Sequence, residues 1–222
     1  VFWDSFFGYH NLRRYTSVVN NHSEPWWFFL FIMLVAALPF SVFLFHGIIH
    51  TIKELLNKSK EGLDGPGSLY IFSLCWIISV FLFFSISATK LTSYWIPAIP
   101  AASILITRSA QLLLNKKKEI SVIWLLTTLI LFGLALAFYF SNSWLVLIKD
   151  PEMPNLAYEI RNYGLILRGK IFLSVMTILS TFFIFKYFPR SVLYLQVFFF
   201  SSQLFLMPPI RKLADNLRQE PL

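Results

Sequence analysis

Two short polar segments hold the residues best suited to chemistry, and the first covers residues 6–15. If this segment is helical, His10 lies on one face with Arg13 and Arg14, three and four residues further on. Arginine suits phosphate because its planar guanidinium donates two parallel hydrogen bonds. The segment therefore predicts a phosphate site in which Arg13 and Arg14 bind, with His10 and Asn11 as polar contacts. A basic amphipathic helix resting on anionic lipid is the alternative, and chemistry alone favours it.

The second segment, residues 87–97, follows a long apolar run and contains Lys90 and Tyr94. Lys90 could simply extend its ammonium to the membrane interface. The alternative is that Lys90 neutralises a lipid-linked phosphate while the hydroxyl of Tyr94 donates to one of the phosphate oxygens.

Prolines interrupt two of the apolar runs that position these segments. Pro39 lies within the first run, and Pro97 and Pro100 follow Tyr94. A proline removes a backbone donor, so a break inside lipid needs protein or water to satisfy the freed carbonyl. The Pro97 and Pro100 pair predicts either a site at a broken helix end or a simple kink near the interface, with equal weight.

The elements behind these segments are long apolar runs. The chain has 222 residues, of which 57% are hydrophobic and only 14% charged. A helix of about 20 apolar residues crosses the hydrocarbon core of a bilayer. Six segments approach or exceed that length, and the last two are short for full spans: 26–49, 69–88, 94–114, 120–140, 171–185 and 192–207.

These runs predict an all-α, polytopic transmembrane bundle of about six spans, with an interfacial amphipathic helix at the N-terminus. We expect three regions: an extracytoplasmic interfacial segment (1–25), a transmembrane domain (26–207) and the start of a truncated extracytoplasmic region (208–222). The chain begins at Val1 and ends just after a charged segment, so we expect it to be part of a longer protein.

The basic residues indicate an orientation. The formal net charge is +8, but the cations lie in short connections between apolar runs, which indicates membrane topology and not nucleic-acid binding. The run Lys116-Lys117-Lys118 is the best marker of the cytoplasmic side. Residues 1–25, Lys90 and 141–170 then lie on the extracytoplasmic side, although that set is not poor in basic residues either. We expect the single cysteine, Cys75, to be a buried small apolar residue.

Both polar segments resemble the signatures of one family. Residues 6–15, the stretch Asn-His-Ser-Glu-Pro-Trp-Trp-Phe-Phe at 21–29 and Leu-Pro-Phe-Ser at 38–41 are similar to the central signature of bacterial membrane glycosyltransferases akin to the lipid A aminoarabinose transferase. These enzymes belong to the polyprenyl-phosphate-sugar-dependent GT-C superfamily, which includes protein mannosyltransferases. Residues 87–100, with Lys-Leu, Tyr and Pro-x-x-Pro, resemble a second signature of this family.

The resemblance implies a multi-pass cell-membrane enzyme that transfers a hexosyl or pentosyl group from a polyprenyl-phosphate donor. The acceptor would be a lipid or protein on the extracytoplasmic face, and the chain would be the later half of such an enzyme. No segment corresponds to the family's catalytic-aspartate loop, so the catalytic residue is unknown and the chain alone is expected to be inactive. The family has Glu-His where this chain has His10-Asn11, so no cofactor is predicted, although a divalent metal at His10 stays open.

A non-enzymatic lipid or solute transporter is the alternative from another class. It predicts ionisable residues along a pathway at mid-membrane. The predicted spans are almost free of charge between the interfaces, which favours the glycosyltransferase. His46 and His50 are four residues apart, a spacing compatible with a metal, but with no third ligand we interpret them as interactions at a helix end.

Overall fold

The computed structural model describes residues 16, 24–57, 66–147, 155–186 and 190–219, and all of the regular elements in these ranges are helical. Five of the described helices are long and apolar enough to cross a membrane, or six spans result if a bent helix pair counts as one. The prediction of an all-α, multi-pass membrane fold is confirmed. The chain divides into two compact units, residues 1–112 and 113–222. Each unit is described by itself.

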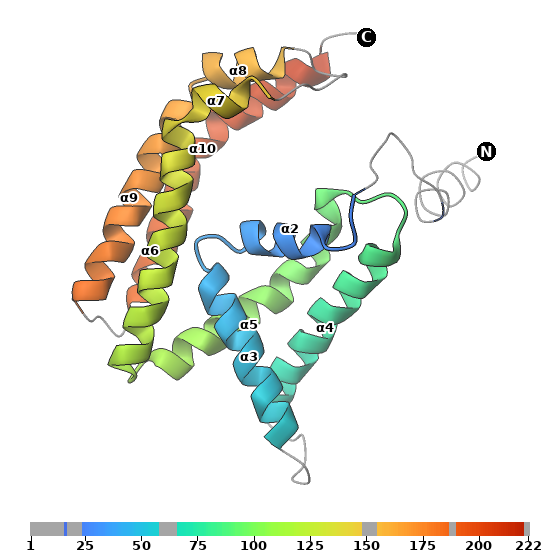
Figure 1. Ribbon diagram of the computed structural model, residues 1–222, viewed down its shortest axis with the longest axis vertical. Coiled ribbons are helices and arrows are strands. Elements are labelled where there is room, and N and C mark those ends of the chain that lie inside the picture. Colours follow the sequence, from blue (N-terminus) through green and yellow to red (C-terminus); the bar gives the residue numbers. More distant parts are fainter. Residues whose placement is uncertain (1–15, 17–23, 58–65, 148–154, 187–189, 220–222) are drawn as a thin grey trace. The chain divides into compact units, whose positions relative to one another are not determined.

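The described part of the first unit includes four long or medium α-helices and one 3₁₀ helix (Figure 1). In chain order these are α2 (Phe28–Ala36), α3 (Ser41–Asn57), α4 (Pro66–Ile86), the 3₁₀ helix η2 (Thr92–Ala98) and α5 (Ile99–Leu113). Helices α3, α4 and α5 run along the unit in alternating directions. Helix α2 lies across one end of the unit. Helix α2 contacts α3, α4 and η2.

The first predicted span, 26–49, is wrong as a single helix. Helix α2 ends at Ala36, the Leu38–Pro39 peptide bond is cis, and α3 begins at Ser41 and runs to Asn57. The axes of α2 and α3 are bent by 115°. Proline cannot donate to the carbonyl four residues earlier, so the helix stops where Pro39 enters. The pair forms a broken span or a re-entrant element.

The core of the first unit is packed around η2 and α5. Trp95, Ala98, Ala101 and Leu105 are buried against Leu44 and other apolar residues of α2, α3 and α4. The alanines allow neighbouring backbones to approach closely, which is how membrane helices pack without a hydrophobic drive between them. Cys75 corrects one expectation, because its side chain is exposed on α4. On a spanning helix such a position faces lipid.

Among its described residues, the second unit has three long helices and two short ones. They are α6 (Lys117–Tyr139), α7 (Ser141–Leu145), α8 (Leu156–Asn162), α9 (Leu165–Phe185) and α10 (Ser191–Gln219). Helix α9 packs against both α6 and α10, and α7 and α8 lie at one end of these helices (Figure 1). Hydrogen bonds between helices join Thr128 to Ser180 (2.8 Å) and Trp124 to Ser191 (3.1 Å).

The last two spans are longer than predicted. The expected range 171–185 is the later part of α9, which begins at Leu165, and the range 192–207 is the first part of α10, which continues to Gln219. Helix α10 passes through Pro208 and Pro209, so no helix end marks the expected boundary at 207. Polar residues near the ends of both helices shortened the apolar runs that the sequence displays.

Candidate functional site

The predicted site residues divide into two groups. His10, Asn11, Arg13 and Arg14 lie outside the described residues, so their proposed roles stay predictions. Lys90 and the rest of the second polar segment lie at one end of the first unit, in the turn that joins α4 to η2 and in η2 itself.

The side chain of Lys90 is buried, although it belongs to a connection between two helices. Its relative exposure is 9%, and its ammonium donates to the backbone carbonyl of Ser87, with 2.8 Å between Nζ and O. The hydroxyl of Ser87 in turn donates to the carbonyl of Thr89 at 2.9 Å. Ser87 and Thr89 are themselves buried. The turn therefore fixes the ammonium in place, and the interpretation that Lys90 extends freely into the interface does not describe this structure.

No carboxylate among the described residues lies within ion-pair distance of Lys90. An ammonium has three N–H donors, and the carbonyl of Ser87 accepts from only one of them. Burying a charge without an opposite charge is unfavourable by several kcal/mol on the order-of-magnitude scale for ions in proteins. An anion at this position would remove that cost.

Tyr94 stands beside the same turn as part of an aromatic group. Its ring stacks on Phe84 of α4, with 4.6 Å between centroids and 26° between planes, and Phe84 contacts Phe29 of α2. Phe29 is almost fully buried. The stack ties α2, α4 and η2 together, and it leaves the hydroxyl of Tyr94 without a hydrogen bond to any other described residue.

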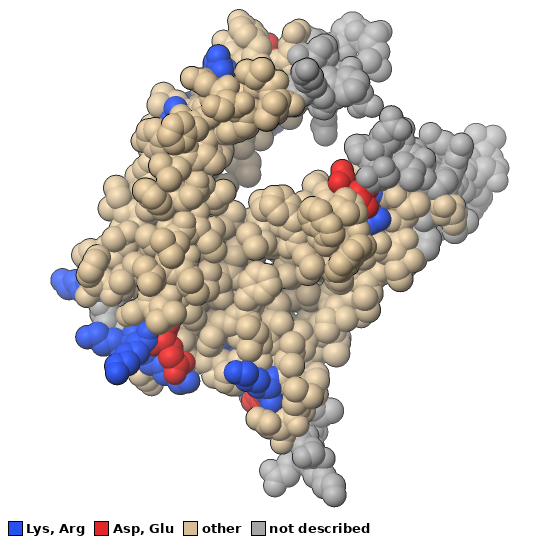
Figure 2. Space-filling view, in the orientation of Figure 1, with Lys and Arg blue, Asp and Glu red and all other residues tan. Residues whose placement is uncertain are grey.

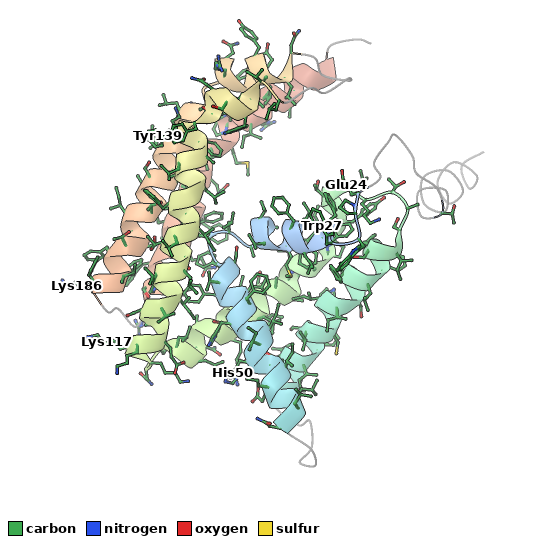
Figure 3. The ribbon with its side chains drawn as sticks, in the orientation of Figure 1. Glu24, Trp27, His50, Lys117, Tyr139 and Lys186 are labelled. Atoms are coloured by element: carbon green, nitrogen blue, oxygen red, sulfur yellow. The ribbon has the colours of Figure 1, made fainter. Side chains whose placement is uncertain are left out.

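Helix α2 begins beside this end of the unit, where Figure 3 labels Glu24 and Trp27. Trp26 and Trp27 are exposed, at 68% and 50%. Amphipathic indole rings favour the membrane–water interface, so the exposed pair indicates that α2 lies at interface depth. Glu24 is exposed as well, and in the described part of the chain it forms no ion pair with Lys90.

Pro97 and Pro100 lie where one type of helix changes to another, and not in the middle of a single α-helix. Pro97 lies in η2, and Pro100 is the second residue of α5. The first turn of a helix has no partner for its N–H groups, so proline is tolerated there. The two prolines therefore mark the change from 3₁₀ to α-helix directly after Lys90 and Tyr94, and Thr92–Leu113 still qualifies as one span.

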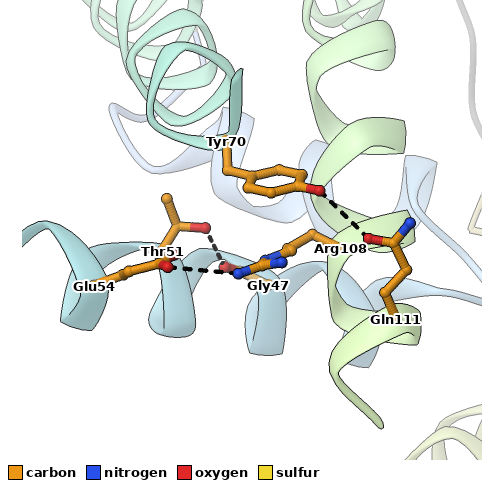
Figure 4. A network of polar contacts seen from close by, with 6 residues as sticks. All are labelled: Gly47, Thr51, Glu54, Tyr70, Arg108 and Gln111. Atoms are coloured by element: carbon orange, nitrogen blue, oxygen red, sulfur yellow. Dashed lines mark hydrogen bonds and ion pairs between the residues drawn. The ribbon is translucent and has the colours of Figure 1, made fainter. Parts of the chain in front are cut away.

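Sequence reasoning missed a second polar cluster at the other end of the first unit (Figure 4). The guanidinium of Arg108 forms an ion pair with Glu54 (3.5 Å) and lies 4.4 Å from the centroid of the Tyr70 ring. The hydroxyl of Tyr70 donates to Gln111 at 3.3 Å. These residues come from α3, α4 and α5, and no local spacing relates them. In the sequence, the only signal for this cluster was that its residues lie near the ends of long apolar runs.

His46 and His50 of α3 lie near this cluster. Nδ1 of His46 lies 2.9 Å from the hydroxyl of Ser109 on α5, so the histidine joins two helices and does not cap its own. The two imidazole centroids are 6.3 Å apart. Among the described residues no group of three or more His, Cys, Asp or Glu side chains could hold a metal ion.

Several known proteins are similar in sequence to this chain. The chain is 32% identical over 106 residues to the undecaprenyl phosphate-alpha-4-amino-4-deoxy-L-arabinose arabinosyl transferase of Erwinia tasmaniensis, covering 47% of this chain and 17% of the relative. It is 31% identical over 122 residues to the protein of the same name in Wigglesworthia glossinidia brevipalpis, covering 54% and 20%. A Pseudomonas fluorescens transferase is 25% identical over 162 residues, covering 72% and 28%.

No protein family model and no solved structure matches the chain. The aligned part spans 17 to 28% of the length of the relatives named above. The chain is thus homologous, over about half of its own length, to the undecaprenyl-phosphate aminoarabinose transferases, and the resemblance to GT-C membrane glycosyltransferases akin to the lipid A aminoarabinose transferase is confirmed.

Proposed function

We propose that this chain is part of an integral membrane glycosyltransferase that moves a sugar from a polyprenyl-phosphate donor to a lipid or protein acceptor on the extracytoplasmic face. The observation that carries the proposal is the buried ammonium of Lys90, which among described residues has one backbone carbonyl as its partner. The names of the relatives supply the class of donor, an undecaprenyl-phosphate-linked sugar.

The chemistry of transfer explains why a fixed cation is useful. When the glycosidic bond to phosphate breaks, negative charge develops on the phosphate that leaves. A cation already in place stabilises that charge without reorganising during the step. Lys90 is held by the Ser87 carbonyl at 2.8 Å and still has donors to offer. Tyr94, whose ring is fixed on Phe84, is proposed to donate its hydroxyl to a phosphate oxygen.

The first polar segment is proposed to complete the phosphate site. Arg14 and Arg13 would supply bidentate guanidinium groups, and His10 and Asn11 would supply polar contacts or, for His10, a metal ligand. The carboxylate that activates the acceptor is proposed to come from a loop of the longer protein. The three regions, 1–25, 26–207 and 208–222, are retained as the proposed domain organisation.

The lysine run at the start of α6 is the basis for proposing an extracytoplasmic site, although the opposite end of the second unit is also basic. Lys117 at the start of α6 and Lys186 after α9 lie at the same end of that unit (Figure 3). Retention of basic residues in the cytoplasm would place that end inside. Because η2 and α5 connect the Lys90 segment to the turn before α6, this assignment would put Lys90 on the extracytoplasmic side.

The test is a transfer assay on the full-length protein reconstituted with a radiolabelled undecaprenyl-phosphate sugar and a cell-envelope extract as acceptor. We expect donor consumption by the wild type, and a loss of roughly 100-fold or more with Lys90→Met, the scale found when a charge-stabilising group is removed. Lys90→Arg should retain part of the rate. Lys117→Met is the matched control, because it removes one lysine charge from the start of α6, in the second unit.

Two outcomes would contradict the proposal. Equal rates for the wild type and Lys90→Met would remove Lys90 from the phosphate site. Movement of the labelled donor across the membrane without release of its sugar would support the transporter instead.

A further inference from the structure

The second unit carries basic residues at both of its ends. One end is formed by the start of α6, the end of α9 and the start of α10, and holds five cations: Lys116, Lys117, Lys118, Lys186 and Arg190. The opposite end, which we call the α8 end, is formed by α7, α8, the start of α9 and the later part of α10. Its described cations are also five: Arg161, Arg168, Lys170, Arg211 and Lys212.

Retention of positive charge in the cytoplasm explains basic residues at one end of a spanning unit and not at both. The excess at the α8 end therefore needs another reason. The described carboxylates there are Glu159 and Asp215, and Asp215 approaches only Arg211, at 4.0 Å between two well exposed side chains. The α8 end is left with net positive charge, part of which is visible in Figure 2.

Three of these cations are positioned by neutral groups and not by carboxylates. Arg161 donates to the side-chain oxygen of Asn142 at 3.1 Å. Arg168 donates to the backbone carbonyl of Phe205 at 2.6 Å. Nζ of Lys170 lies 5.3 Å from the centroid of the Tyr139 ring. Within the described residues none of the three forms an ion pair, so no carboxylate neutralises them where α8 meets the spanning helices.

We propose that the α8 end binds the phosphate groups of anionic membrane lipids. A surface of this kind fits lipid head groups because its cations surround the ends of helices whose sides are exposed and apolar, as at Leu167 and Ile171. A lipid bound there has its acyl chains along α9 and its phosphate beside the cations. Each cation near an anionic surface contributes about fivefold to binding, the equivalent of about 1 kcal/mol. The proposal stands apart from the donor site at Lys90, which belongs to the first unit.

The test uses the protein in nanodiscs with a fluorescent reporter at the α8 end. Cys75 is replaced by Ala, and Leu167→Cys, at a position 62% exposed, is labelled with bimane. Brominated phosphatidylglycerol and brominated phosphatidylcholine then quench the label in separate discs. We expect phosphatidylglycerol to quench several-fold more strongly. The variant Arg161→Gln/Lys170→Gln/Lys212→Gln should abolish the preference, and it leaves Arg168 and its bond to the α10 backbone intact.

The matched control removes three charges from the other end, with Lys117→Gln/Lys118→Gln/Lys186→Gln, and should leave quenching at position 167 unchanged. Equal quenching by the two lipids, or a preference that survives the loss of Arg161, Lys170 and Lys212, would overturn the proposal. Inorganic phosphate at millimolar concentration and matched ionic strength separates the two sources of phosphate. Loss of the preference in its presence would show a site for soluble phosphate and would overturn the assignment to lipid.

Discussion

At the scale of single residues, charged side chains in this protein are held by unusual partners. Lys90 has a backbone carbonyl, Arg108 has a carboxylate and an aromatic face, and Lys170 has an aromatic face alone. A cation above a ring gains about 0.5–2 kcal/mol, most where water is excluded. Aromatic rings at the ends of the spans thus stabilise charge where carboxylates are scarce.

Substitutions of Tyr70 separate the contribution of its aromatic ring from that of its hydroxyl hydrogen bond. Tyr70→Phe keeps the ring 4.4 Å from the Arg108 guanidinium and removes only the exposed 3.3 Å hydrogen bond to Gln111. We expect it to lower the free energy of unfolding by under about 0.5 kcal/mol, because that bond is long and solvated. Tyr70→Leu removes the ring and should cost about 1 kcal/mol more. Unfolding by SDS titration in mixed micelles measures both, and equal losses would show that the ring is not what holds Arg108.

The sequence alone identified some of these residues but not their contacts. Lys90 and Tyr94 stand out because they follow a long apolar run and precede two prolines. The ion pair between Glu54 and Arg108 joins residues far apart in the sequence, and only the packing of α3 against α5 brings them together. The burial of Lys90 was equally hidden, since a lysine at the end of an apolar run more often reaches water.

At the scale of elements, one glycine allows α3 and α5 of the first unit to approach closely. A Cβ added to Gly47 of α3 would collide with the backbone carbonyl of Leu105 on α5. A backbone carbonyl cannot rotate away as a side chain can, so Gly47→Ala must separate the helices. We expect a loss of about 1–3 kcal/mol in stability, the usual cost of overpacking.

Gly133 provides the matched control for that prediction. A Cβ added to Gly133 of α6 meets nothing within 4 Å. Gly133→Ala should therefore leave stability unchanged or raise it by up to about 1 kcal/mol, the difference in helix propensity. Thermal unfolding of both variants in detergent checks the pair, and a Gly47→Ala protein as stable as Gly133→Ala would show that α3 and α5 do not cross this closely.

Helix α10 contains two prolines, and at the second of them another helix supplies the donor that the proline lacks. Pro209 has no N–H for the carbonyl of Phe205, four residues earlier, and Arg168 of α9 donates to that carbonyl at 2.6 Å. Arg168→Met should cost about 1 kcal/mol, because it removes a short hydrogen bond from a charged donor at an exposed site.

A double-mutant cycle with Pro209→Ala tests this explanation. Alanine restores the N–H, so Arg168→Met should cost much less in the Pro209→Ala background, and the SDS titration should show coupling of about 1 kcal/mol between the two positions. Additive losses would mean that Arg168 and Pro209 act independently. The sequence could not reveal the pairing, because Arg168 shortened the apparent span of α9 and the prolines suggested an end to α10.

At the scale of the whole molecule, composition predicted the class of protein well. Long apolar runs with few charges indicated an all-α, multi-pass membrane protein, and five described helices meet the requirements for spanning. The sequence did not predict the path of the chain at residues 37–40. Hydropathy continues across Pro39, so apolar length alone merged α2 and α3 into one span although their axes differ by 115°. The division into two units depends on packing and left no mark in the sequence.

We propose that the buried ammonium of Lys90 receives the phosphate of a polyprenyl-phosphate donor. The most direct test is the affinity of the full-length protein, in detergent, for undecaprenyl phosphate without a sugar, measured for the wild type, Lys90→Arg and Lys90→Met. We predict that Lys90→Met weakens binding by about 10- to 150-fold, the equivalent of a hydrogen bond to a charged group, and that Lys90→Arg weakens it less. Undiminished binding by Lys90→Met, with a correctly inserted protein, would contradict the account.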